Sequence, residues 1–197
     1  MGSETNGTRG GAPARTLLNV FALVIYIPGP LGRFLDDLRR ELVPNDNPRA
    51  HVSVLPPRPL AAESEWEAAR DQARALAGRG AAFQVEATGV HVFPVTDVIY
   101  IDVGKGEAEL RQMHEAMDSQ RLAWQEPYPY HPHITLAQDV PGDRVREIQE
   151  LAEARWREFD GPKWFVADRV TFVRNSTGNH WVDLAEFPLG EVTPVRR

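Results

Sequence analysis

Two short stretches decide the fold of this 197-residue chain, His51-Val52-Ser53-Val54 and His133-Ile134-Thr135-Leu136. Each contains a histidine, an apolar residue, a hydroxyl residue and a second apolar residue, in that order. Because residues i and i+2 of a β-strand face the same side, each stretch predicts an imidazole beside a hydroxyl, with the apolar side chains in the core. Two such strands in one small chain predict a paired acid–base site built by internal duplication.

Composition limits the classes of protein to which the chain can belong. Its length suits one well-buried domain, and its apolar content of 42% and charged content of 25% are ordinary for a globular protein. The absence of cysteine excludes disulfides, thiolate zinc sites and a cysteine nucleophile. A net charge of −6 argues against a protein that coats nucleic acid through a broadly basic surface. It does not exclude a local basic groove.

The N-terminal segment superficially resembles a secretion signal. Residues 1–16 are rich in Gly, Ser, Thr and Asn, and they are expected to form a disordered leader. The apolar run Leu17–Ile27 follows basic residues, but Asn19 interrupts it and Pro28-Gly29-Pro30 follows it without a small-residue cleavage site. At about 11 residues the run is also too short to span a membrane. We therefore expect a buried first strand and a soluble, cytoplasmic protein.

Strands and helices are predicted to alternate along the chain. Apolar runs and period-2 alternation predict strands over residues 17–27, 50–55, 83–87, 89–93, 98–103, 132–137, 164–174 and 180–187. Apolar residues at helical spacing predict helices over residues 29–42, 62–77, 105–120 and 142–158. Pro56-Pro57-Arg58-Pro59 should end the first histidine strand, Pro44–Pro48 should form a loop, and residues 175–179 should form a hairpin turn. A single α+β domain over residues 17–190, followed by a tail at 191–197, is the simplest fold that contains these elements.

The order of these predicted elements repeats. Each half of the domain contains an apolar strand, a helix, a histidine strand, a proline-containing stop, a second helix and a pair of strands. The first half ends with the strand at 89–93 and the second with the strand at 180–187. A pseudo-two-fold duplication would bring the histidine strands together across a central cleft, one from each half. Such a site needs no third catalytic group.

These features make the chain resemble the two-histidine (2H) phosphoesterase superfamily. It is most similar to the bacterial branch called 2′-5′ RNA ligases or cyclic phosphodiesterases. The matching stretches are Ala50–Pro59, Gly89–Pro94 and Pro132–Ala137, and the resemblance covers roughly residues 17–190. It implies a bilobal fold, in which two intertwined, related αβ lobes with antiparallel sheets surround a central cleft. It also implies no metal and no nucleotide cofactor.

The residue types of the two stretches suit phosphodiester chemistry. Opening a 2′,3′-cyclic phosphate, or cleaving a ribose phosphodiester, needs a base on the attacking oxygen and an acid on the leaving oxygen. Histidine suits both roles because it titrates near neutral pH. His51 and His133 are therefore the predicted catalytic pair, with either one as the acid. Ser53 and Thr135 would donate hydrogen bonds to the non-bridging phosphoryl oxygens. Exchanging the roles of the two histidines would run the reaction backwards, as 2′-5′ RNA ligation.

The expected partner is a nucleotide or an RNA end that carries a cyclic phosphate. Many RNA-active relatives have a basic residue shortly after the second histidine stretch, where this chain has Gln138. A small nucleotide or an ADP-ribose-type cyclic phosphate therefore fits at least as well as a long RNA. We expect the protein to act as a monomer, without a metal, a cofactor or contact with a membrane.

Four further residues are possible substrate contacts. Tyr128 and Tyr130 precede the second histidine stretch and could stack on a base at the rim of the cleft, although aromatic residues there also suit simple packing. Arg58 could approach a phosphate or simply be solvated. His91 could line the cleft or face solvent.

Two other functions stay open at the level of sequence. The same cleft could bind a nucleotide or RNA without turning it over. Alternatively, His131 and His133 could ligate a metal ion in a metal-dependent hydrolase, because a His-x-His pair on one strand face can hold a metal.

Overall fold

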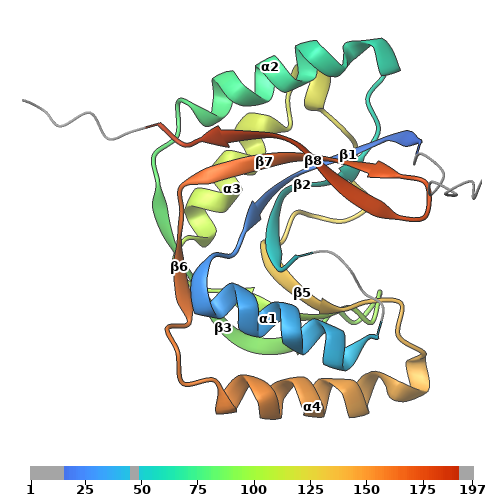
Figure 1. Cartoon of the computed structure of the whole chain (residues 1–197), viewed down its shortest axis with the longest axis vertical. Helices are drawn as coiled ribbons and strands as arrows, with labels where there is room; N and C mark the ends of the chain where they lie inside the picture. The colour runs from blue at the N-terminus through green and yellow to red at the C-terminus, as the bar shows by residue number, and fades with distance from the viewer. Residues whose placement is uncertain (1–15, 45–48, 191–197) are drawn as a thin grey trace, which may run out of the picture.

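The computed structural model describes residues 16–44 and 49–190 (Figure 1). Three segments lie outside these ranges: the predicted leader except for Thr16, the loop residues 45–48 and the predicted tail. The strands are β1 (Leu17–Tyr26), β2 (His51–Arg58), β3 (Phe83–Val92), β4 (Ile99–Val103), β5 (His133–Ala137), β6 (Trp164–Ala167), β7 (Arg169–Ser176) and β8 (His180–Pro188). The α-helices are α1 (Gly29–Leu42), α2 (Trp66–Ala77), α3 (Glu107–Met117) and α4 (Val145–Glu158).

The strands form one curled antiparallel sheet of eight, in the order β6-β3-β4-β5-β2-β1-β7-β8. The two histidine strands, β2 and β5, are the central neighbours of this order. Counted outward from them, the halves are β2-β1-β7-β8 and β5-β4-β3-β6, so the predicted pseudo-two-fold duplication is visible in the sheet order. The predicted α+β fold with two related lobes is confirmed.

The helices exchange between the two halves. Helix α1 connects β1 to β2 but packs against β5 and α4, whereas α3 connects β4 to β5 but packs against β2 and α2. Figure 1 shows the consequence, because α2 and α3 lie together on one side of the molecule and α1 and α4 on the other. Each lobe therefore contains elements from both halves of the sequence.

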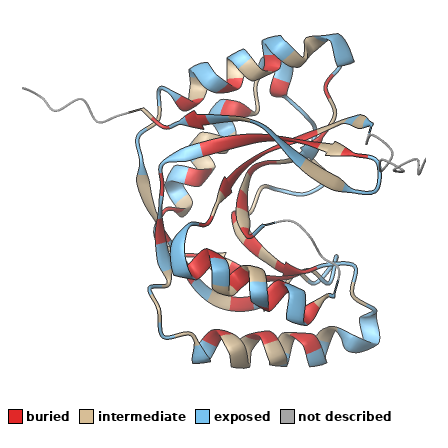
Figure 2. Cartoon of the chain, in the orientation of Figure 1, coloured by how far each residue is buried: buried red, intermediate tan, exposed pale blue. Residues whose placement is uncertain are grey.

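The core lies between the sheet and these helices (Figure 2). Strand β1 contributes to it with Phe21, Leu23 and Ile25, while Ala22 and Val24 are buried in a second, smaller cluster on the other face of the sheet. Burial on both faces explains why this strand is a continuous apolar run. Helix α4 instead buries one stripe, formed by residues Ile148, Ala152 and Trp156.

Strand β2 extends further than predicted, through Pro56 and Pro57 to Arg58. Its pairing with β1 has a register shift, because Leu23 is opposite Leu55 whereas Phe21 is opposite Arg58. A bulge of this kind accommodates prolines, since residues within it do not need to donate to the ladder. The strand therefore ends within the predicted stop at Pro56–Pro59, but at Arg58 rather than at Leu55.

Two other strand predictions also need correction. The expected strands at 83–87 and 89–93 are one strand, β3, which pairs with β6 through residues 83–86 and with β4 through residues 87–92. A register shift between Ala87 and Val90 accommodates Thr88 and Gly89. The expected strand at 164–174 is instead two strands, because the chain leaves β6 at Asp168 and enters β7 in the other half of the sheet.

Candidate active site

The two histidine stretches meet at the centre of the sheet. Val52 of β2 is paired with Ile134 of β5, and both side chains are completely buried. In an antiparallel register centred on this pair, the next positions align His51 with Thr135 and Ser53 with His133. Since the side chains of Val52 and Ile134 point into the core, the two histidines and the two hydroxyl residues face the opposite side. The structure thus brings together the four side chains that the sequence predicted to act together.

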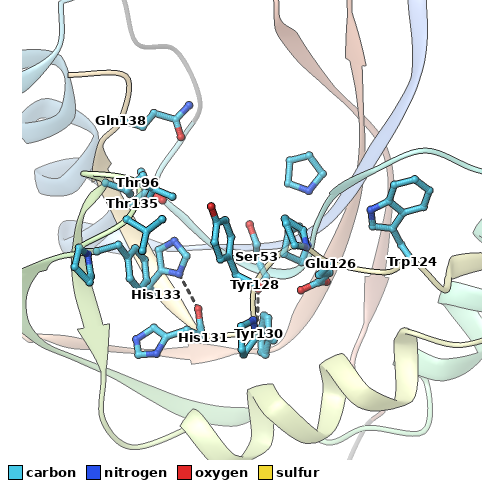
Figure 3. A pocket seen from close by; sticks show the side chains of 18 residues that line it. Ser53, Thr96, Trp124, Glu126, Tyr128, Tyr130, His131, His133, Thr135 and Gln138 are labelled. Carbon is cyan, nitrogen blue, oxygen red and sulfur yellow. Dashed lines mark hydrogen bonds between the residues drawn. The ribbon is translucent and has the colours of Figure 1, made fainter. Parts of the chain in front are cut away.

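A cavity of about 500 Å³ opens on this face (Figure 3). Ser53, His133 and Thr135 line it, whereas His51 lies outside its walls. Two segments form most of its other walls, the turn after β3 and the loop before β5. The turn contributes Phe93, Pro94, Val95, Thr96 and Val98, and the loop contributes Trp124, Glu126, Pro127, Tyr128, Pro129, Tyr130 and His131. Pro56, Pro57 and Gln138 complete the lining. Among the described residues that line the cavity, none is Lys or Arg.

Both catalytic candidates make the same backbone contact. Nδ1 of His133 lies 2.7 Å from the carbonyl oxygen of His131, and Nδ1 of His51 lies 2.6 Å from the carbonyl oxygen of Arg49. A carbonyl oxygen can only accept, so Nδ1 carries the proton in both rings. In the neutral ring Nε2 is then the unprotonated nitrogen, and Nε2 is the atom that can exchange a proton with a substrate.

The ring of His133 is enclosed by aromatic side chains. The rings of Phe93 and Tyr100 contact it edge-on, at centroid distances of 5.0 and 5.4 Å. Burial lowers the pKa of His133, because the charged imidazolium loses its hydration there, and nearby His131 lowers the pKa further. The hydrogen bond to the His131 carbonyl and the charge of Asp102 oppose this shift. At neutral pH His133 is therefore in its neutral, basic form.

Arg58 lies beneath the loop before β5 rather than in the cavity. Only 1% of its surface is exposed. Its guanidinium donates to Asp118 Oδ1 at 2.6 Å, to the carbonyl of Leu122 at 3.1 Å and to Glu126. This placement does not favour the predicted phosphate contact. Arg58 instead fixes the loop that forms one wall of the cavity.

Tyr130 lines the cavity but is held from behind. Its hydroxyl donates to the carbonyl of Ser53 at 2.8 Å, and its ring stacks on His114 at a centroid distance of 3.8 Å. Burial raises its pKa, so the hydroxyl stays protonated as a donor. Tyr130 therefore ties the loop before β5 to the β2 strand that carries Ser53 (Figure 3).

The remaining predicted contacts divide between the rim and the outside of the cavity. Tyr128 and Trp124 both line the cavity, and they are 54% and 46% exposed. Val95, on the turn after β3, also lines the cavity and is 74% exposed. His91 is exposed and packs near Tyr100, outside the cavity lining.

Sequence reasoning missed Asp102. Its Oδ1 accepts a hydrogen bond from Nε2 of His131 at 2.9 Å, and its backbone is paired with that of His133. A signal was present, because Asp102 is the one carboxylate in an otherwise apolar strand, Ile99–Val103. A charged residue in such a strand needs a partner.

The described residues offer no cluster that would support the hypothesis of a metal site at His131 and His133. Across residues 16–44 and 49–190, no group of three or more His, Cys, Asp or Glu side chains is arranged to hold a metal ion. The ring centroids of His131 and His133 are 6.2 Å apart, and Nε2 of His131 is hydrogen-bonded to Asp102.

No helix within residues 16–44 and 49–190 is long and apolar enough to cross a bilayer.

A family model described as the 2′-5′ RNA ligase superfamily matches residues 27–179. The chain belongs to this superfamily. The resemblance to 2H phosphoesterases inferred from the two histidine stretches is confirmed. The 2′-5′ RNA ligase superfamily thus accounts for most of the chain, from the end of β1 to the turn between β7 and β8.

Individual relatives are distant but cover nearly the whole chain. A Geobacillus kaustophilus (strain HTA426) protein with a provisional phosphoesterase name is 21% identical over 178 residues, which are 86% of this chain and 96% of the relative. The structure of Escherichia coli LigT with 3′-AMP is 16% identical, with a TM-score of 0.59, and covers 89% of this chain and 98% of its own. The protein TT0787 of Thermus thermophilus is 17% identical, with a TM-score of 0.65, and covers 88% and 99%. The solved structures establish the fold, and the family and fold together indicate a phosphoesterase or 2′-5′ RNA ligase-like enzyme.

Proposed function

We propose that the protein is a metal-independent phosphodiesterase that opens 2′,3′-cyclic phosphates by acid–base catalysis between His51 and His133. The observation that carries this proposal is the alignment of the two histidine stretches across β2 and β5, with both rings held in the same tautomer. Membership of the 2′-5′ RNA ligase superfamily supports it.

In the proposed reaction His133 is the base and His51 the acid. The lowered pKa of His133 supports the role of base, because Nε2 is then free of a proton at neutral pH. Water attacks phosphorus and gives its proton to His133, while the bond to one ribose oxygen breaks and that oxygen takes a proton from His51. Ser53 and Thr135 donate to the non-bridging oxygens as their charge grows. Each histidine is expected to contribute about 10²–10⁴-fold.

The cavity supports a small nucleotide as the substrate. A volume of about 500 Å³ falls within the range of small-molecule sites. Exposed aromatic side chains at its rim suit a nucleobase, and LigT structures are known with 3′-AMP, NADP+ and ATP. The cation-poor lining offers little to a long polyanion, which favours a mononucleotide or a short RNA end. Under the same proposal the protein acts as a monomer, and 2′-5′ ligation is the same ring opening with the 5′-hydroxyl of a second RNA end attacking in place of water.

The test is hydrolysis of 2′,3′-cyclic AMP by the purified protein in the presence of EDTA. We expect turnover in the wild type and a loss of at least about 10²-fold in His51→Ala and in His133→Ala. His180→Ala, on the edge strand β8, is the matched control and should retain activity. Full activity in both catalytic variants, or complete loss in EDTA, would contradict the proposal. Tight binding without product would favour the alternative of a nucleotide- or RNA-binding module.

A further inference from the structure

The residue two positions before each catalytic histidine is held by a carboxylate from another strand. Nε2 of His131 donates to Oδ1 of Asp102 on β4, at 2.9 Å. On the other side of the site, Nη2 of Arg49 donates to Oδ2 of Asp183 on β8, at 3.1 Å, and its guanidinium lies 3.5 Å above the ring of Tyr26. Each half of the duplicated sheet thus has its own side-chain contact with a carboxylate at the equivalent sequence position.

The same two residues supply the carbonyls that hold the catalytic rings. The carbonyl of His131 accepts from Nδ1 of His133, and the carbonyl of Arg49 accepts from Nδ1 of His51. In each case one residue is fixed through its side chain and orients a catalytic histidine through its backbone. Each carboxylate is therefore connected to a catalytic ring through a single intervening residue.

Strand pairing alone does not fix these two carbonyls. Strands β2 and β5 begin at His51 and His133, so Arg49 and His131 precede the ladders. A peptide unit outside the ladder can rotate unless another contact holds it. At His131 the contact with Asp102 meets this need. At Arg49 the contact with Asp183 shares it with Asp36 of α1, whose Oδ1 accepts from the N–H of Ala50, in the same peptide unit, at 2.6 Å.

The two carboxylate contacts differ in detail, although they act on equivalent positions. Asp102 also accepts a hydrogen bond from the backbone of Val103 at 3.0 Å, which fixes the carboxylate that holds His131. Asp183 instead accepts from the hydroxyl of Tyr26 at 2.6 Å. Burial, and to a smaller extent the hydrogen bond to Asp183, raises the pKa of Tyr26 to about 12. The hydroxyl therefore remains a donor at neutral pH. Each carboxylate therefore has a second contact that keeps it in place.

We propose that Asp102 and Asp183 are positioning residues that keep His133 and His51 in the Nδ1-protonated tautomer, through His131 and Arg49 respectively. This inference rests on the proposed function only for its kinetic consequence. Loss of either carboxylate should lower kcat while KM changes little, because neither lines the cavity. The expected fall is about 10- to 100-fold, the effect typical of residues that orient a reactive group from behind.

The decisive measurement is ¹⁵N NMR of histidine-labelled protein at about pH 8, which is above the ordinary histidine pKa of about 6.5. The nitrogen shifts report which ring nitrogen carries the proton, whatever the substrate. We expect the Nδ1–H tautomer for His51 and His133 in the wild type. Asp102→Ala should produce a mixture of tautomers at His133 alone. Asp183→Ala should produce a mixture at His51 alone, with a smaller share of the minor tautomer because Asp36 still holds the Arg49–Ala50 peptide unit.

Kinetics of the same variants complete the test. Asp102→Asn and Asp183→Asn keep an acceptor oxygen and should recover part of the lost kcat. Glu41→Gln is the control, because it removes the ion pair with Arg155, which has a similar exposure and joins α1 to α4 away from the site. Unchanged tautomers in both alanine variants would overturn the inference, whatever the activity. Absence of turnover in the wild type would contradict the proposed function, and the NMR result would still decide this inference.

Discussion

Val52 of β2 lies directly opposite Ile134 of β5. In the part of the chain that the structure describes, this is the one residue pair in the ladder between these two strands. Both side chains are completely buried. Every other neighbouring pair of strands in the sheet has a longer ladder. The alignment of the two histidine stretches therefore depends on how well one apolar pair packs at the junction of the lobes.

The first prediction follows from this junction. Ile134→Ala should lower the free energy of unfolding by about 2–5 kcal/mol, because it leaves a cavity in the core, and it should also lower kcat by disturbing the alignment of the histidines. Val166→Ala, on the edge strand β6, is the control and should change stability by less than about 0.5 kcal/mol, because Val166 is 47% exposed. Urea denaturation measures the stability of both variants. Equal losses in the two variants would show that the junction is not a critical contact.

The second prediction concerns the buried cation beneath the loop. Arg58→Met should destabilise the protein by about 3–5 kcal/mol, because it removes the guanidinium that Asp118 and Glu126 share. Since Glu126 lines the cavity, the loosened loop should raise KM more than it lowers kcat. Thermal unfolding and steady-state kinetics test the two parts separately.

Arg58→Lys sharpens this second test. Lysine keeps the charge but cannot reproduce several fixed donors, so it should recover only a small part of the stability. Arg155→Ala is the control for the loss of an arginine, because its ion pairs lie at the surface and are expected to contribute little. A normal KM in Arg58→Met, together with a normal melting temperature, would show that Arg58 does not fix the wall of the cavity.

The parts of the site that follow a local pattern could be predicted from the sequence. The alternation of His51-Val52-Ser53-Val54 identified a strand and the face on which each residue lies, because both depend only on the period of the strand. The apolar run of β1 likewise predicted a buried strand. The pseudo-two-fold relation could be predicted because the order of elements repeats along the chain.

The parts that depend on register and on exchange between lobes could not be predicted. Asp102 reaches His131 only because β4 pairs with β5 in a particular register. Arg58 becomes buried because a bulge carries β2 past two prolines that normally end a strand. The break at Asp168 separates two strands that belong to opposite halves of the sheet, a long-range choice without a local sequence signal.

The third prediction concerns the dependence of stability on pH. Burial holds the pKa of His133 below its ordinary value of about 6.5, so near and below that pH the unfolded chain binds more protons at this position than the folded chain. The contribution of this residue to the free energy of unfolding therefore falls as the pH falls. His133→Gln should show a weaker dependence than the wild type between about pH 7 and pH 5, measured by urea titrations. Identical dependences would contradict the assignment.

The same shift predicts the shape of the pH–rate profile. If His133 is the base, kcat/KM should fall on the acid side with a midpoint below about 6.5, because the neutral imidazole persists to lower pH. His131→Ala removes a neighbour that lowers this pKa and should move the midpoint upward. A midpoint above the ordinary histidine value would instead favour His133 as the acid.

The fourth prediction concerns the aromatic rim of the cavity and assumes the proposed function. Trp124→Ala and Tyr128→Ala should raise KM for 2′,3′-cyclic AMP by about tenfold or more with little change in kcat, because stacking on a base typically contributes about 1–3 kcal/mol. Neither change should affect a cyclic phosphate that lacks a base, such as glycerol 1,2-cyclic phosphate. Trp164→Ala is the matched control, because Trp164 has a similar exposure, 49%, but lies on the edge strand β6. An equal rise in KM for both substrates would mean that the rim shapes the phosphate site rather than binding the base.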